Sequence, residues 1–164
     1  MNPVFVFGTL KQGFPNSGIN KGSRVAGEFV TKDRYPLYLV GERYSPWLVL
    51  NEGAGFQVRG QVSLVDEATL IDMDKLERTH ETDGYRRVQM TVISESTNEE
   101  ILVFVYVKTP RQLEAVLVQL GPIAEYELEH ASLYQSRSCR EIAMLTSFAR
   151  SGDSKFPMGG FSAG

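Results

Sequence analysis

The sequence predicts an α+β fold in which a small curved sheet or barrel carries helices on its outside. Three observations lead to this prediction. Short strand-like segments fill residues 4–65 and return after one central helix, and further helical segments follow them. A parallel α/β fold would instead alternate strands with helices. The chain has 164 residues, of which 42% are hydrophobic, and this is enough to bury one core.

The first half of the chain reads as short strands separated by turns. Residues 4–7 are an apolar run typical of a strand buried on both faces. Residues 11–24 are rich in Gly, Asn, Ser and Lys and are expected to form a loop. Residues 25–33 alternate as a short strand, and residues 34–65 form several more, broken by glycines and a proline.

The strongest helix prediction covers residues 66–79. Asp66 is suited to the N-cap position, where its side chain can accept a backbone hydrogen bond. Residues 85–93 and 100–108 are expected to form a β-hairpin around a polar loop. The sequence therefore places this helix between two groups of strands.

The end of the chain is expected to be helical and then disordered. Residues 110–120 open on a proline and are followed by a glycine, which favours a second helix. Residues 123–134 are of mixed character, and residues 141–150 carry apolar side chains at helical spacing. Residues 150–164 are rich in Gly and Ser and are expected to be disordered. We therefore expect one domain over residues 1–149, followed by this tail.

Composition argues against several classes of partner. The chain holds 17 Lys and Arg against 20 Asp and Glu, a net charge of −3, which gives no case for nucleic acid or an anionic membrane. No apolar run is long enough to span a membrane, and no secretory signal is visible. His80, His130 and the single cysteine, Cys139, lack metal-ligand spacing, so we expect no metal. A cytoplasmic monomer is expected.

One carboxylate of the central helix lies on the face expected to be apolar. At about 100° per residue, Glu77 falls between Leu70 and Met73 on a helical wheel. Burial disfavours the ionised form, and the C-terminal end of the helix dipole acts in the same direction. A glutamate with a raised pKa is suited to general acid–base catalysis.

Ordinary structural explanations for Glu77 remain open at this stage. The helix could end before Glu77, or the carboxylate could pair with Arg86 or Arg87. Glu81 is a weaker candidate acid–base, in a polar stretch where solvation is the simpler expectation. Trp47 is expected in the core.

Four stretches form a pattern when taken together. They are VFVFGTLKQGFPN at 4–16, YPLYLVGERYSPWLV at 35–49, GAGFQVRGQV at 53–62 and MDKLERTHETDGYRR at 73–87. In this order and spacing they resemble the γ-glutamyl cyclotransferase-like proteins, which include the plant AIG2-like group. The second stretch resembles the members that act on γ-glutamylamines.

The resemblance implies a small mixed β-barrel flanked by helices and a reaction that needs no cofactor. In that reaction the α-amine of a γ-glutamyl group attacks its own γ-carbonyl, so that 5-oxoproline forms and an amine leaves. The catalytic glutamate of the family matches Glu77. The expected partner is thus a small γ-glutamyl substrate.

The resemblance also assigns the loop after the first strand to substrate binding. Its members are Phe7, Gly8, Thr9 and Leu10, and the backbone N–H groups around Gly8, Thr9 and Leu10 can hold a carboxylate or a developing oxyanion. We further expect support from three side chains of the predicted hairpin, Tyr85, Arg87 and Tyr106.

The sequence departs from the family at two positions. Phe7 stands where the family usually has tyrosine, and Ser63 replaces a common aromatic residue. Beyond residue 136 no match can be placed. Three functions stay open: a cyclotransferase acting on γ-glutamylamines such as γ-glutamyl-ε-lysine, one acting on γ-glutamyl-α-amino acids or glutathione, and a binding or stress-response protein without turnover.

Overall fold

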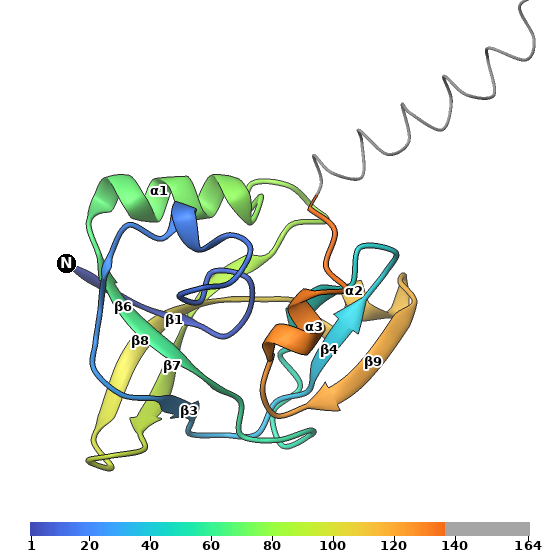
Figure 1. Ribbon diagram of the computed structural model, residues 1–164. Helices are drawn as coiled ribbons and strands as arrows, with labels where there is room; N and C mark the ends of the chain where they lie inside the picture. The colour runs from blue at the N-terminus through green and yellow to red at the C-terminus, as the bar shows by residue number, and fades with distance from the viewer. Residues whose placement is uncertain (137–164) are drawn as a thin grey trace, which may run out of the picture.

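A closed barrel of five strands forms the centre of the fold. The structure, a computed structural model, describes residues 1–136. Within this part of the chain the strands are ordered β1-β8-β7-β3-β6 and close by a β6–β1 pairing (Figure 1). Their bounds are Asn2–Val6 (β1), Phe29–Thr31 (β3), Arg59–Val65 (β6), Arg86–Ser94 (β7) and Glu100–Val107 (β8). β1 and β8 run parallel and the other neighbours antiparallel, so the predicted mixed barrel is confirmed.

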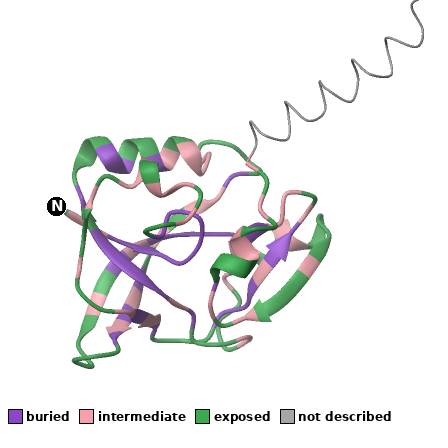
Figure 2. Cartoon of the chain, viewed as in Figure 1, coloured by how far each residue is buried: buried purple, intermediate pink, exposed green. Residues whose placement is uncertain are grey.

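The pairing of β1 with β6 closes the barrel and fixes where β1 ends. A side chain at Gly60 would meet the carbonyl oxygen of Val6 at 2.6 Å and the ring of Phe5 at 2.8 Å, so only glycine fits beside β1 here. Residues 4–11 are all buried, as Figure 2 shows for β1 and the loop after it. The loop that leaves β1 therefore turns inside the protein.

A second sheet packs beside the barrel. Its order is β5-β4-β9, with bounds Leu37–Val40 (β4), Ser45–Leu48 (β5) and Val118–Ile123 (β9) (Figure 1). Val49 and Lys108 form a parallel bridge that joins the end of β5 to the end of β8. The second sheet is thus attached to the barrel where β8 ends.

Helix α1, Glu67–Leu76, covers one side of the barrel. The Asp66 carboxylate accepts a hydrogen bond of 2.8 Å from the Thr69 N–H, which confirms the predicted N-cap. Leu70 and Met73 are buried against the barrel. They belong to a cluster of Val4, Val6, Leu10, Val65, Leu70, Met73 and Tyr106. Helix α1 therefore lies against the strand and loop at the start of the chain.

The predicted helix over 110–120 is wrong beyond its first turn. Helix α2 covers only Pro110–Glu114, where a capping box starts it, and β9 follows. Residues Val116–Leu120 have apolar side chains that fit a helix by spacing. From Val118 onward these residues form β9, because they pair with β4, a partner distant in sequence.

The remaining elements are short. They are η1 Ser17–Ile19, β2 Ser23–Arg24, which pairs with β6, and α3 Leu128–Ala131. Across residues 1–136, none of the helices has the length and apolar character needed to cross a membrane. The predicted helix at 141–150 and the predicted disordered tail lie outside the described residues.

Candidate active site

A cavity of about 1140 Å³ opens where the barrel, the second sheet and the loop after α1 meet. Seven of the eight residues that the sequence analysis selected line it. They are Phe7, Gly8, Thr9, Leu10, Glu77, Tyr85 and Tyr106. The fold thus brings the loop after β1 and the end of α1 to one place.

The loop after β1 presents unused backbone donors to the cavity. The Lys11 N–H donates to the Gly8 carbonyl at 3.1 Å, which makes a tight turn. The structure shows no acceptor within residues 1–136 for the N–H groups of Thr9 and Leu10, although both residues are buried. Successive free N–H groups in a turn form a concave site for an anion.

Neighbouring side chains hold this loop in place. Asn16 donates from its side chain to the Thr9 hydroxyl at 2.9 Å and from its backbone N–H to the Thr9 carbonyl at 2.8 Å. A side chain at Gly8 would meet the ring of Pro46 at 2.8 Å. Since the loop is fixed on both sides, its free donors are preorganised.

Glu77 is the C-cap residue of α1 and keeps its place on the helix face. Its N–H donates to the Met73 carbonyl at 2.9 Å, and its carbonyl accepts from the Tyr85 N–H at 2.9 Å. The intervening residues 78–84 fold back so closely that a side chain at Gly84 would lie 1.7 Å from the Arg78 carbonyl oxygen. This tight loop fixes Glu77 at the cavity.

The Glu77 carboxylate has no partner among the described side chains. Arg86 donates instead to backbone carbonyls of the loop, and Arg87 pairs with Asp74 at 2.8 Å. The structural ion pair considered from the sequence is therefore absent. Burial raises the pKa of Glu77 to about 7, against the opposing effects of Lys108 and Arg43.

Two tyrosines of the predicted support group line the cavity. The Tyr85 hydroxyl donates to the Pro46 carbonyl at 2.8 Å, and the Tyr106 hydroxyl donates to the Asp74 carboxylate at 2.7 Å. Burial raises the pKa of both hydroxyls, so both stay protonated at neutral pH. Arg87, the third member, is absent from the cavity lining. It binds the other oxygen of Asp74, so it supports Tyr106 from outside.

Phe7 and Ser63 mark the departures from the family pattern. Phe7 is buried, lines the cavity and packs against Phe5 with ring centroids 6.3 Å apart. The buried Ser63 hydroxyl accepts from the Asn20 side chain at 3.1 Å. Phe7 therefore brings an aromatic ring without a hydroxyl to the site.

The other candidate acid from the sequence, Glu81, is exposed and does not line the cavity.

Sequence reasoning missed Lys108 and misplaced Trp47. Lys108 is 3% exposed and lines the cavity, with its ammonium 4.3 Å from the centroid of the Trp47 ring. Trp47 is half-buried at the cavity wall and is not enclosed in the core. A lysine that ends an apolar strand gives no sequence signal of burial, because the second sheet that covers it is formed by other segments.

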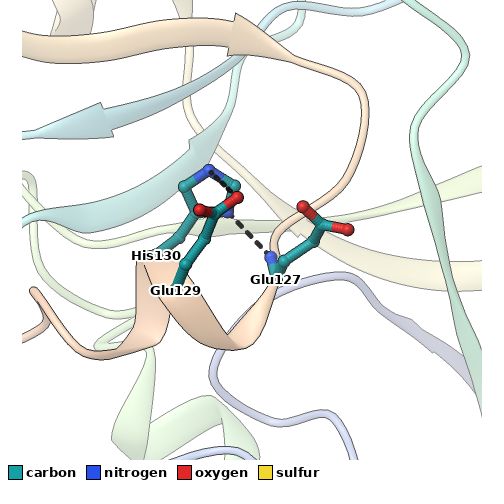
Figure 3. A group of neighbouring side chains, drawn as sticks. All are labelled: Glu127, Glu129 and His130. Atoms are coloured by element: carbon teal, nitrogen blue, oxygen red, sulfur yellow. Dashed lines mark hydrogen bonds and ion pairs between the residues drawn. The ribbon is translucent and has the colours of Figure 1, made fainter.

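A separate group of acidic side chains lies on α3. Figure 3 shows Glu127, Glu129 and His130, whose potential ligand atoms lie within 4.8 Å of one another. The Nδ1 atom of His130 already accepts the Glu127 N–H at 2.9 Å, and both carboxylates are exposed. The group is not part of the cavity lining, and we assign it no role.

Comparison with known proteins gives a consistent result. The family model described as "Gamma-glutamyl cyclotransferase, AIG2-like" matches residues 4–122. A γ-glutamylaminecyclotransferase of Bos taurus is 37% identical over 145 residues, which are 84% of this chain and 84% of that protein. The γ-glutamylaminecyclotransferase B of Danio rerio is 36% identical over 114 residues, 65% of this chain and 59% of that protein.

A solved structure matches the fold. The crystal structure of an AIG2-like protein from Mus musculus has a TM-score of 0.65 and 28% sequence identity, and the match covers 79% of this chain and 90% of that one.

Proposed function

Because the chain belongs to the γ-glutamyl cyclotransferase, AIG2-like family, we propose that it is an enzyme that converts γ-glutamylamines into 5-oxoproline and a free amine. The proposal rests on one observation, which is that an acid and two hydrogen-bond donors lie at the same cavity. The unpaired carboxylate of Glu77 and the free N–H groups of Thr9 and Leu10 line one cavity, although they are far apart in the sequence.

In the proposed reaction the substrate is anchored at the loop after β1. The N–H groups of Thr9 and Leu10 hold the glutamyl carboxylate or the oxyanion that develops on the γ-carbonyl. The attack is intramolecular, so the substrate already supplies proximity, and the cavity has to supply orientation. The rigid turn held by Asn16 serves this purpose.

Glu77 moves the protons. The α-amine nitrogen bonds to the γ-carbonyl carbon while Glu77 takes a proton from the α-ammonium group. Glu77 passes this proton to the leaving nitrogen and takes a second proton from the ring nitrogen, which keeps one N–H in 5-oxoproline. The bond between the γ-carbonyl carbon and the leaving nitrogen breaks, and Glu77 gives the second proton to the leaving amine, which departs as an ammonium ion. A carboxyl with a pKa of about 7 can act in both directions at neutral pH. All atoms and charges balance without a metal or organic cofactor.

The experiment is to incubate the protein with γ-glutamyl-ε-lysine and to measure lysine and 5-oxoproline. We expect both products in equal amounts. A parallel panel of γ-glutamyl-α-amino acids and glutathione separates the two substrate classes. Faster turnover of that panel would replace the γ-glutamylamine assignment. Thermal stabilisation by 5-oxoproline without turnover of any substrate would show a binding protein instead.

A further inference from the structure

Lys108 places a buried cation at the wall of the same cavity. Its ammonium donates to the Asp83 carbonyl oxygen at 2.5 Å. It also lies 4.3 Å from the centroid of the Trp47 ring and 4.5 Å from that of the Tyr85 ring. Within residues 1–136 it forms no ion pair with a carboxylate. Two aromatic faces and one carbonyl thus hold this charge.

The backbone of Lys108 is fixed as firmly as its ammonium. Its N–H donates to the Leu48 carbonyl at 2.9 Å, and its carbonyl accepts from the Leu50 N–H at 2.9 Å. These bonds tie the end of β8 to both sides of the end of β5. The position of the charge is therefore set by the junction of the barrel and the second sheet.

Burying an ammonium group without a carboxylate partner costs free energy, so the surroundings of Lys108 have to offset this cost. Burial lowers the pKa of Lys108 to about 8, and Asp83 and Glu77 oppose this change. Glu77 is the unpaired acid in the same cavity. Tyr85 connects the two residues, since its ring faces the Lys108 ammonium and its N–H binds the Glu77 carbonyl.

We propose that Lys108 is a positioning residue for the reaction, whose ammonium, fixed at the wall of the cavity that Glu77 lines, stabilises the negative charge of the Glu77 carboxylate. This inference rests on the proposed function, because ionised Glu77 is the form that accepts the substrate proton. Without the cation, a larger part of the Glu77 carboxyl population would be protonated at neutral pH, and that part could not accept the substrate proton.

Other charged groups surround the pair. Arg43, between β4 and β5, also favours ionised Glu77, and the Tyr85 and Tyr106 hydroxyls are further titratable groups that interact with it. Lys108 itself is near Asp83, which favours its charge, and near Arg78 and Arg86, which oppose it. Lys108 is the more deeply buried of the two cations that favour ionised Glu77, so it is screened less by water.

The test uses three variants. Lys108→Met removes the charge and keeps an unbranched side chain, and Lys108→Arg keeps the charge. Lys32→Met is the matched control, because Lys32 is an exposed lysine paired with Glu100 at 2.8 Å. The Glu77 carboxyl is followed by ¹³C NMR titration of the free protein, and kcat/KM is measured as a function of pH. Melting temperatures establish that each variant is folded.

We expect Lys108→Met to move the Glu77 titration and the acidic limb of kcat/KM upward by about one pH unit. Lys108→Arg and Lys32→Met should keep the midpoint of the unaltered protein. An unchanged Glu77 midpoint in folded Lys108→Met would overturn the inference. The NMR titration needs no turnover, so failure of the proposed function would appear separately, as absence of product from the unaltered protein.

Discussion

The backbone N–H of Tyr85 donates a 2.9 Å hydrogen bond to the carbonyl oxygen of Glu77. This bond closes the loop at 78–84 and places both side chains at one cavity. Glu77 lies at the end of α1, where a helix would otherwise fray. The loop fixes the chain at this point and so makes Glu77 part of a site.

Gly84→Ala should disrupt this loop. A methyl group at this position would lie 1.7 Å from the Arg78 carbonyl oxygen, a contact with backbone that cannot move aside. We expect a lower melting temperature and a loss of turnover. Gly18→Ala is the control, since no atom lies within 4 Å of its added carbon. Equal behaviour of the two variants would contradict the importance of the loop.

The rate should depend on pH through Glu77. Because its pKa is about 7, kcat/KM for γ-glutamyl-ε-lysine should rise from pH 5, reach half of its plateau at about pH 7 and level off above about pH 8, as the carboxylate forms. A profile that is flat between pH 5 and 8 would show that another group accepts the proton. The measurement is a series of initial rates at constant ionic strength.

The raised pKa of Glu77 should make the folded protein less stable as the pH rises, although it makes the enzyme more active. The pKa of Glu77 is higher in the folded protein than the ordinary value of 4.5, so the folded state binds more protons than the unfolded state. Stability should therefore fall as the pH rises from about 4.5 to 7. The Glu77→Gln variant should not lose this stability. The difference between its melting temperature and that of the unaltered protein should therefore increase as the pH rises from 5 to 8. If this difference in melting temperature did not change with pH, the raised pKa of Glu77 would be contradicted.

Phe7→Tyr tests the departure from the family pattern. Phe7 lines the cavity, so a hydroxyl added to its ring could bond the substrate. One added hydrogen bond is expected to raise kcat/KM by about 2- to 10-fold. Unchanged kcat/KM in a folded variant would mean that the ring contributes packing alone.

The sequence predicted much of the site but less of its surroundings. Helical periodicity places Glu77 among apolar residues, and this prediction depends only on the spacing of residues within one helix. Arg87 does not line the cavity, because its guanidinium pairs with Asp74, the same carboxylate that accepts the Tyr106 hydroxyl. Lys108 and the strand at 118–123 depend on the second sheet, whose pairings join distant segments. Such pairings override local patterns.

The most direct measurement of the central claim is 5-oxoproline release by Glu77→Gln. Glutamine keeps the shape of the side chain but cannot accept the proton, so we expect the rate to fall by about 100-fold or more. Glu81→Gln, at an exposed acid of the adjacent loop, should retain the rate of the unaltered protein. A folded Glu77→Gln variant that releases 5-oxoproline at the unaltered rate would contradict the account.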